Sequence, residues 1–89
     1  MQMHNVFMVV GAYMLLNLKT EMERNNVYVD DIAKLLNIQR NSASNKINCK
    51  TPITFDEAET IRNVLFPYAD LQYLFKKVNT KKANKVNDD

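Results

Sequence analysis

The sequence predicts an all-α domain, and three observations carry that prediction. The 89 residues include one glycine and two prolines, too few for a turn-rich β fold. Apolar residues recur at spacings of three and four along much of the chain, which is the period of an amphipathic helix. The stretch TFDE, Thr54 to Glu57, matches the capping box that begins many helices. We therefore expect one domain of five helices.

The domain is expected to occupy residues 14–77. Residues 1–13 are an apolar N-terminal extension without Lys, Arg, Asp or Glu, too short for a membrane span of about 20 residues. A strand, a helical extension and partial disorder all remain open for it, as does a natural start at Met14. Residues 78–89 are rich in lysine and asparagine with few apolar anchors, so a flexible, disordered tail is expected there.

The first helix is predicted over residues 15–25 and the second over residues 29–36. Leucines and a methionine at helical spacing form the inner face of the first helix, which ends at two asparagines that tolerate a left-handed turn. Asp30 and Asp31 lie in the first turn of the second helix, where the helix dipole favours negative charge. Asn37 ends that helix.

The stretch QRNSASNK, residues 39–46, has no bulky apolar residue, and a loop is the alternative to a helix here. A loop favours Gly or Pro, and the stretch contains neither. Ala43 and Ile47 lie four residues apart and would face inward together, with polar side chains on the outer side. The pattern predicts a third, short helix with a wide polar face.

The fourth helix is predicted to begin at the Thr54 capping box and to end before Pro67. Its inner stripe is expected to contain Ala58, Ile61, Val64 and Leu65. Asp70 can cap a short fifth helix over LQYLFKK, residues 71–77.

Helices two and three, joined by a tight turn, predict helix-turn-helix geometry. Ala33 is small where the two helices cross, and Asn37 takes the left-handed turn position. Ile38 fills the angle, while Ala43 and Ile47 bury the inner side of the third helix. This arrangement leaves the outer face of the third helix free to enter a major groove of DNA.

The motif DDIAKLLNIQRNSASNKIN, followed by PITFDEA and FPYADLQYLF, resembles the lambda-repressor-like helix-turn-helix family of phage Cro and repressor proteins, also called the XRE type. It is most similar to the small Cro-like proteins of phages that infect Gram-positive bacteria. The resemblance covers residues 15–66. It implies five helices, dimeric binding to an operator, and transcriptional control in the cytoplasm of a bacterial host cell, at the nucleoid.

By position, the resemblance implies base contacts from Arg40, Asn41, Ser44 and Asn45. Phosphate contacts are expected from Gln39, Lys34, Lys46, Asn48 and Lys50. The chemistry agrees, because arginine matches the O6 and N7 atoms of guanine and asparagine matches adenine. Residues 32–55 also contain no acid, which suits contact with phosphates. Cys49 stands where the family often has glycine, so a non-glycine residue must hold the turn there.

A dimer interface is expected after Pro67. Leu71, Leu74 and Phe75 share one side of the fifth helix, which a two-fold partner could bury. The rival interpretation is that this helix folds back entirely onto its own core.

The function predicted on these grounds is a sequence-specific DNA-binding transcriptional regulator, a Cro-like phage repressor. It would act as a homodimer on a pseudo-palindromic operator in double-stranded DNA. The alternative is a protein-binding adaptor, such as an antitoxin or a phage inhibitor of host defence. No enzyme is expected, because the sequence contains no nucleophile–base pair and no phosphate loop. A single cysteine, far in sequence from His4, predicts no metal site, and no cofactor, small-molecule ligand or membrane partner is expected.

Overall fold

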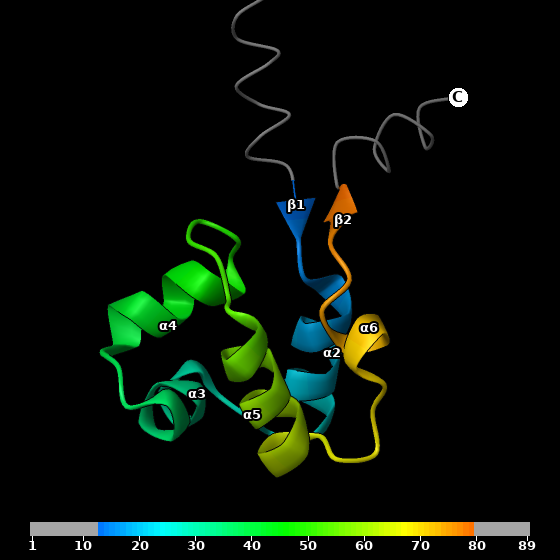
Figure 1. The fold of residues 1–89 in the computed structure, drawn as a ribbon, viewed down its shortest axis with the longest axis horizontal. Coiled ribbons are helices and arrows are strands. Elements are labelled where there is room, and N and C mark those ends of the chain that lie inside the picture. The colour runs from blue at the N-terminus through cyan, green and yellow to red at the C-terminus, as the bar shows by residue number, and fades with distance from the viewer. Residues whose placement is uncertain (1–12, 80–89) are drawn as a thin grey trace, which may run out of the picture.

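Helices dominate the fold, and one small sheet joins its two ends (Figure 1). The computed structural model describes residues 13–79. In chain order the elements are β1 (Tyr13–Met14), α2 (Leu16–Arg24), α3 (Val29–Leu36), α4 (Arg40–Ile47), α5 (Phe55–Leu65), α6 (Leu71–Leu74) and β2 (Val78–Asn79). The five predicted helices are all present. The sheet was not predicted.

The helix bounds agree closely with the sequence patterns, except in the last helix. The second helix has the predicted bounds, Val29–Leu36, and the stretch predicted to be helical rather than a loop is α4. α6 is shorter than expected, since it ends at Leu74 and does not continue through the two lysines that follow.

A residue with a left-handed backbone that is not glycine follows each of α2, α3 and α4. These residues are Asn26, Asn37 and Cys49, with φ angles of 57°, 57° and 64°. In each turn the amide of the residue after the left-handed one donates to a helix carbonyl: Val27 N–H donates to Met22 O, Ile38 N–H to Ala33 O, and Lys50 N–H to Asn45 O. The predicted left-handed turn at Asn37 is confirmed, and Cys49 holds the turn where glycine would be easier.

Side chains form hydrogen bonds with backbone amides at the starts of α5, α6 and α3. Thr54 Oγ1 accepts from Glu57 N–H at 3.1 Å, and Glu57 Oε1 accepts from Thr54 N–H at 3.0 Å, so the predicted capping box is present. Asp70 accepts from Tyr73 N–H at 3.1 Å and caps α6. At the start of α3, only Asp31 contributes, accepting from Tyr28 N–H at 2.7 Å.

The core lies where α2, α5 and α6 meet the pair formed by α3 and α4. Its fully buried large side chains are Phe66, Leu18, Ile32, Ile61 and Leu74. In α5, Ala58 and Ile61 are buried as predicted, but Val64 is 58% exposed. The inner stripe of α5 is therefore narrower than expected, and the placement of Val64 in it was wrong.

The two-stranded sheet corrects the predicted boundaries at both ends of the domain. β1 and β2 pair antiparallel, Tyr13 opposite Asn79 and Met14 opposite Val78. Tyr13 was assigned to the N-terminal extension, and Val78 and Asn79 to the flexible tail. The pairing instead makes these three residues part of the fold. The remainder of the extension and of the tail lies outside the described residues.

A buried carboxylate fastens α6 and the segment before it to α2. Glu21 is 3% exposed, and its two carboxylate oxygens accept hydrogen bonds from the hydroxyls of Tyr68 and Tyr73. The hydrogen bond from Tyr68, with help from Tyr73 and Arg24, holds the pKa of Glu21 below its usual value despite burial. The same hydrogen bonds to Glu21 raise the pKa of both tyrosines. The buried carboxylate of Glu21 thus has hydrogen-bond partners from α6 and from the segment before it.

Candidate nucleic-acid interface

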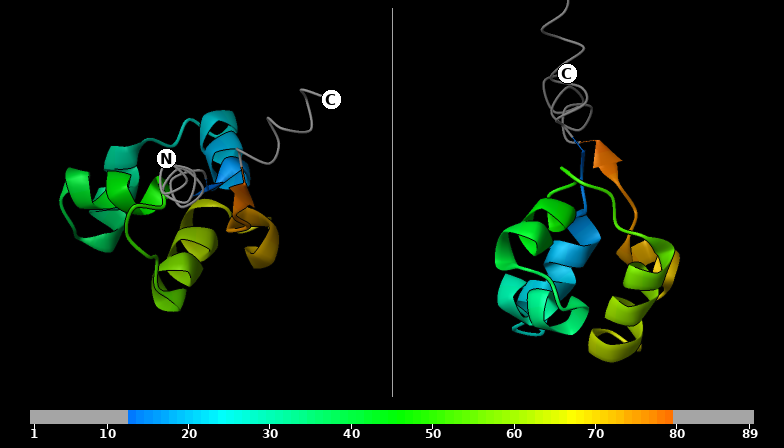
Figure 2. Two further views of the ribbon diagram at one scale, coloured as in Figure 1. Left: turned by 90° about the horizontal axis from the view of Figure 1, so that it is seen from above. Right: turned by 60° about the vertical axis from the view of Figure 1, so that its left-hand side comes forward.

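α3 and α4 form one side of the molecule. α6 lies on the far side from them, and Figure 1 shows α5 in between. Figure 2 shows the same molecule from two further sides. Only three residues separate α3 from α4, beginning with the left-handed Asn37. Ala43 is fully buried and Ile47 nearly so, and α4 packs chiefly against α3. Because these are its only buried side chains, most of the surface of α4 faces away from the core.

The first turn of α4 presents its polar side chains to solvent. Arg40 and Asn41, two predicted base-contacting residues, are exposed, and so are Gln39 and Ser42. The other two predicted base-contacting residues, Ser44 and Asn45, are half-buried. The predicted set is therefore together on one helix, but its first pair is the more accessible.

Arg40 is in contact with an acidic side chain of α3. Its Nε atom lies 2.9 Å from Oδ1 of Asp30, and both side chains remain largely exposed, at 69% and 63%. Asp30 was predicted to lie in the first turn of a helix, where the helix dipole favours its charge, and no local pattern connects it with Arg40. The connection arises because the short turn brings the start of α4 back beside the start of α3.

At the other end of α4, a chain of hydrogen bonds involves three side chains. Lys19 Nζ donates to Asn48 Oδ1 at 2.8 Å, and Asn48 Nδ2 donates to Ser44 Oγ at 3.3 Å. Lys19 comes from α2 and was not predicted to lie beside Asn48, one of the expected phosphate-contacting residues. No local pattern could have found it, because the two residues meet only through the tertiary fold.

Lys46, a predicted phosphate-contacting residue, is held by partners within the fold. Its Nζ lies 3.2 Å from Glu57 Oε1 and donates to the carbonyl of Pro52 at 3.0 Å, and its side chain is only 18% exposed. The N–H of Thr54 and the Lys46 ammonium hold the pKa of Glu57 below its usual value. Lys46 thus ties α4 to the start of α5, and its ammonium group, expected to be free for a phosphate, is already paired.

Lys34 and Lys50, the other two lysines of the predicted phosphate set, are exposed. Neither forms an ion pair within residues 13–79. Their ammonium groups are available to an anion in solution, as Gln39 is to a hydrogen-bonding partner.

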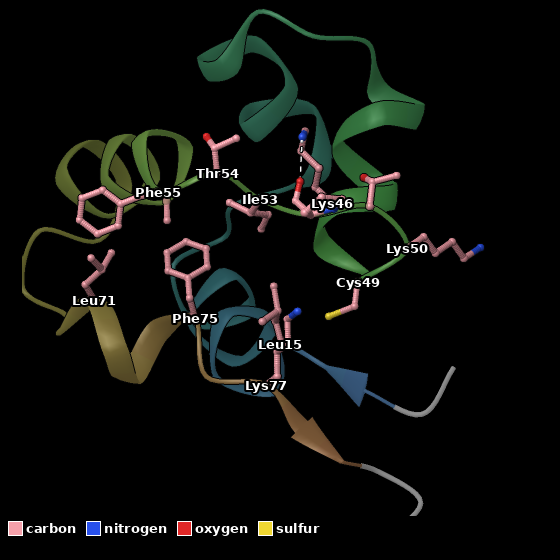
Figure 3. A pocket seen from close by; sticks show the side chains of 13 residues that line it. Leu15, Lys46, Cys49, Lys50, Ile53, Thr54, Phe55, Leu71, Phe75 and Lys77 are labelled. Carbon is pink, nitrogen blue, oxygen red and sulfur yellow. Dashed lines mark hydrogen bonds between the residues drawn. The ribbon is translucent and has the colours of Figure 1, made fainter. Parts of the chain in front are cut away.

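A hollow of about 520 Å³ lies between the loop after α4, the start of α5, and α6 (Figure 3). Leu71 and Phe75, both half-buried, line it together with Phe55, which is 65% exposed. Leu74, predicted to share the dimer interface with Leu71 and Phe75, is instead fully buried in the core of its own chain. For Leu74, this burial agrees with the rival interpretation, in which the helix packs onto its own core.

Within the part of the chain that the structure describes, no helix combines the length and apolar character that a bilayer span requires. In the same part, no group of three or more His, Cys, Asp or Glu side chains could hold a metal ion.

Comparisons with protein-family models, with curated proteins and with solved structures gave no match to this chain. The residues and geometry described above are therefore the grounds on which a function is proposed.

Proposed function

We propose that the protein is a sequence-specific DNA-binding regulator in which α3 and α4 form a helix-turn-helix and α4 is the recognition helix. The observation that carries the proposal is the one-sided burial of α4. Ala43 and Ile47 anchor it on α3, and its first turn is polar and exposed at one side of the molecule. A recognition helix needs this combination, since it must be held rigidly while presenting hydrogen-bonding groups.

The dimensions and side chains of α4 suit the major groove. An α-helix with its side chains is about 10–12 Å in diameter, which matches the major-groove width of about 12 Å. Arg40 can donate two parallel hydrogen bonds to guanine, and Asn41 can exchange two with adenine. Ser44 and Asn45 would contribute from the next turn, after a modest adjustment of half-buried side chains.

The phosphate contacts proposed here leave out Lys46, which is paired with Glu57. Lys34, Lys50 and Gln39 remain as phosphate-contacting candidates, and Lys19 joins Asn48 near the end of α4. Each lysine that neutralises a phosphate releases counterions, so binding should weaken steeply as salt rises.

The regulator would act as a homodimer on a pseudo-palindromic operator and repress by blocking polymerase. One α4 reads only a few base pairs, and two copies about 34 Å apart would read two half-sites. The face proposed for the partner is the apolar border of the hollow, with Phe55, Leu71 and Phe75. Such a protein would work in the cytoplasm of a bacterial cell, at the nucleoid.

Selection from random duplex DNA by the purified protein tests the proposal, with Arg40→Ala selected in parallel. An enriched inverted repeat whose base preference changes in Arg40→Ala supports it. A protein that is folded but enriches no sequence contradicts it and favours the protein-binding adaptor.

A further inference from the structure

The contact between Asp30 and Arg40 joins the first turns of the two helices proposed to bind DNA. Arg40 is the first residue of α4, and Asp30 is the second residue of α3. The 2.9 Å distance between Arg40 Nε and Asp30 Oδ1 is that of a charge-assisted hydrogen bond. Among the predicted base-contacting side chains, Arg40 is the one that forms an ion pair within the described residues.

The atom used by Arg40 decides what remains free. A guanidinium has five N–H donors, and the approach of a carboxylate through Nε occupies its side edge. The outer edge, with one N–H from each terminal nitrogen, is the edge that matches O6 and N7 of guanine. The carboxylate can therefore hold Arg40 while the base-reading edge stays available.

This ion pair contributes little to the stability of the fold. Both side chains are more than half exposed, and exposed ion pairs typically have small effects on unfolding. Asp30 is also not the cap of α3, since the N–H of Tyr28 is satisfied by Asp31. The contact thus adds little to the stability of the fold, but it restrains the long side chain of Arg40.

We propose that Asp30 is a positioning residue that presets Arg40 for guanine and discourages its use on phosphates. The inference rests on the proposed DNA-binding function and deepens it. A preset fork loses less side-chain freedom on binding, so it discriminates better between bases. The carboxylate also repels the phosphate backbone, which lowers affinity for DNA of arbitrary sequence.

The test compares Asp30→Ala and Asp30→Asn with the unaltered protein by sequencing the DNA that each selects and by titrating a random duplex. Asp30→Ala should lower the preference for guanine at the position lost in Arg40→Ala by about five- to ten-fold. It should also raise affinity for random duplex by about two- to five-fold. Asp30→Asn keeps an oxygen acceptor without the charge, so it should retain most of the guanine preference and still bind random duplex more tightly.

Asp56→Asn is the matched control, because Asp56 is also an exposed acid in the first turn of a helix, but in α5. It should leave the guanine preference unchanged. In Asp30→Ala/Arg40→Ala, the preference should equal that of Arg40→Ala alone, because Asp30 would act only through Arg40. Thermal unfolding of each variant should stay close to that of the unaltered protein.

The outcomes separate this inference from the function on which it rests. If the unaltered protein selects an inverted repeat and Asp30→Ala selects the same repeat with the same guanine preference, the positioning role is wrong and the DNA-binding function stands. If Asp56→Asn relaxes the preference as much as Asp30→Ala, the effect is one of general charge and the positioning role is again wrong. If the unaltered protein selects nothing, both proposals fail together.

Discussion

Cys49 has a left-handed backbone conformation that is unfavourable for a residue with a β-carbon. Its φ of 64° is as far into the left-handed region as those of Asn26 and Asn37. Asparagine tolerates this conformation well, whereas a residue such as cysteine is disfavoured there by roughly 1 kcal/mol. The turn persists because the amides of Cys49 and Lys50 satisfy carbonyls of the last turn of α4.

Replacing Cys49 by glycine should therefore stabilise the protein. Cys49→Ala removes the thiol but keeps the backbone strain, so it is the matched reference, and Cys49→Gly should exceed it by about 1 kcal/mol in urea unfolding. Asn37→Gly should change stability much less. Equal stability of the glycine and alanine variants would show that the left-handed turn costs nothing here.

Lys46 and Lys50, four residues apart, should separate a structural lysine from a DNA-contacting one. Lys50→Ala should weaken binding to every sequence and reduce the slope of log affinity against log salt by about one, with unfolding unchanged. Lys46→Ala should instead lower the free energy of unfolding by about 1 kcal/mol, since Glu57 and the Pro52 carbonyl both lose the Lys46 ammonium group. Salt titrations and urea melts of both variants decide the matter. The reverse pattern would exchange the two roles.

At the scale of the element, the Glu21 network makes the docking of α6 on α2 sensitive to acid. The hydrogen bonds from Tyr68 and Tyr73 hold the pKa of Glu21 in the folded protein below its usual value of 4.5. The unfolded chain consequently binds more protons than the folded one in mildly acidic solution. The contribution of Glu21 is fully present above that usual value and is lost as pH falls through the lowered folded pKa.

Glu21→Gln should remove this acid-dependent part of the stability. At neutral pH the variant should melt at a clearly lower temperature than the unaltered protein, and this difference should narrow as the pH falls below 4.5. Glu57, whose pKa is lowered in the same direction, contributes a similar but separate loss, so Glu57→Gln is the companion variant. A gap that does not change between neutral and acidic pH would contradict the assignment of this effect to Glu21.

The sequence predicted elements whose signals are local and missed those whose signals are distant. The capping box at Thr54 and the left-handed asparagine at Asn37 gave the start of α5 and the end of α3. The stripe of α5 was drawn too wide at Val64, since three- and four-residue spacing cannot tell a core edge from a surface. β1 and β2 are two residues each, too short for a periodic pattern, and only the tertiary fold brings them together.

In the candidate interface, too, the features with a local signal could be predicted and the contacts between distant residues could not. Exposure of Arg40 and Asn41 follows from the inward pair Ala43 and Ile47, which helical spacing predicts. The partners of Lys46 could not be predicted, because Glu57 belongs to another helix. The same holds for Lys19 on Asn48, whose contact spans 29 residues of sequence.

For the whole molecule, the proposed dimer has a sharper test now that Leu74 is known to be buried. Phe55→Glu places a charge on a side chain that is 65% exposed, so the monomer should stay folded, lose its partner and bind the selected operator much more weakly. Val64→Glu, on the same helix at 58% exposure but outside the border of the hollow, should remain dimeric.

Mass measurements in solution check the oligomeric state of both variants, and thermal melts check their folding. Leu74→Glu should unfold the chain whatever its oligomeric state, since it puts a charge in the core. A dimeric Phe55→Glu would move the interface away from this face.

The pairing of β1 with β2 affects how often the sheet opens in the folded protein. It joins the two ends of the described chain through two residue pairs, so its formation must close a loop that contains every helix. Long-range pairings with so few contacts form late and open early, because little is gained against the entropy of closure. The sheet should therefore open many times for each unfolding of the core. In hydrogen exchange, amides paired in the sheet should lose protection quickly, while those around Leu18 in α2 exchange only when the whole domain unfolds.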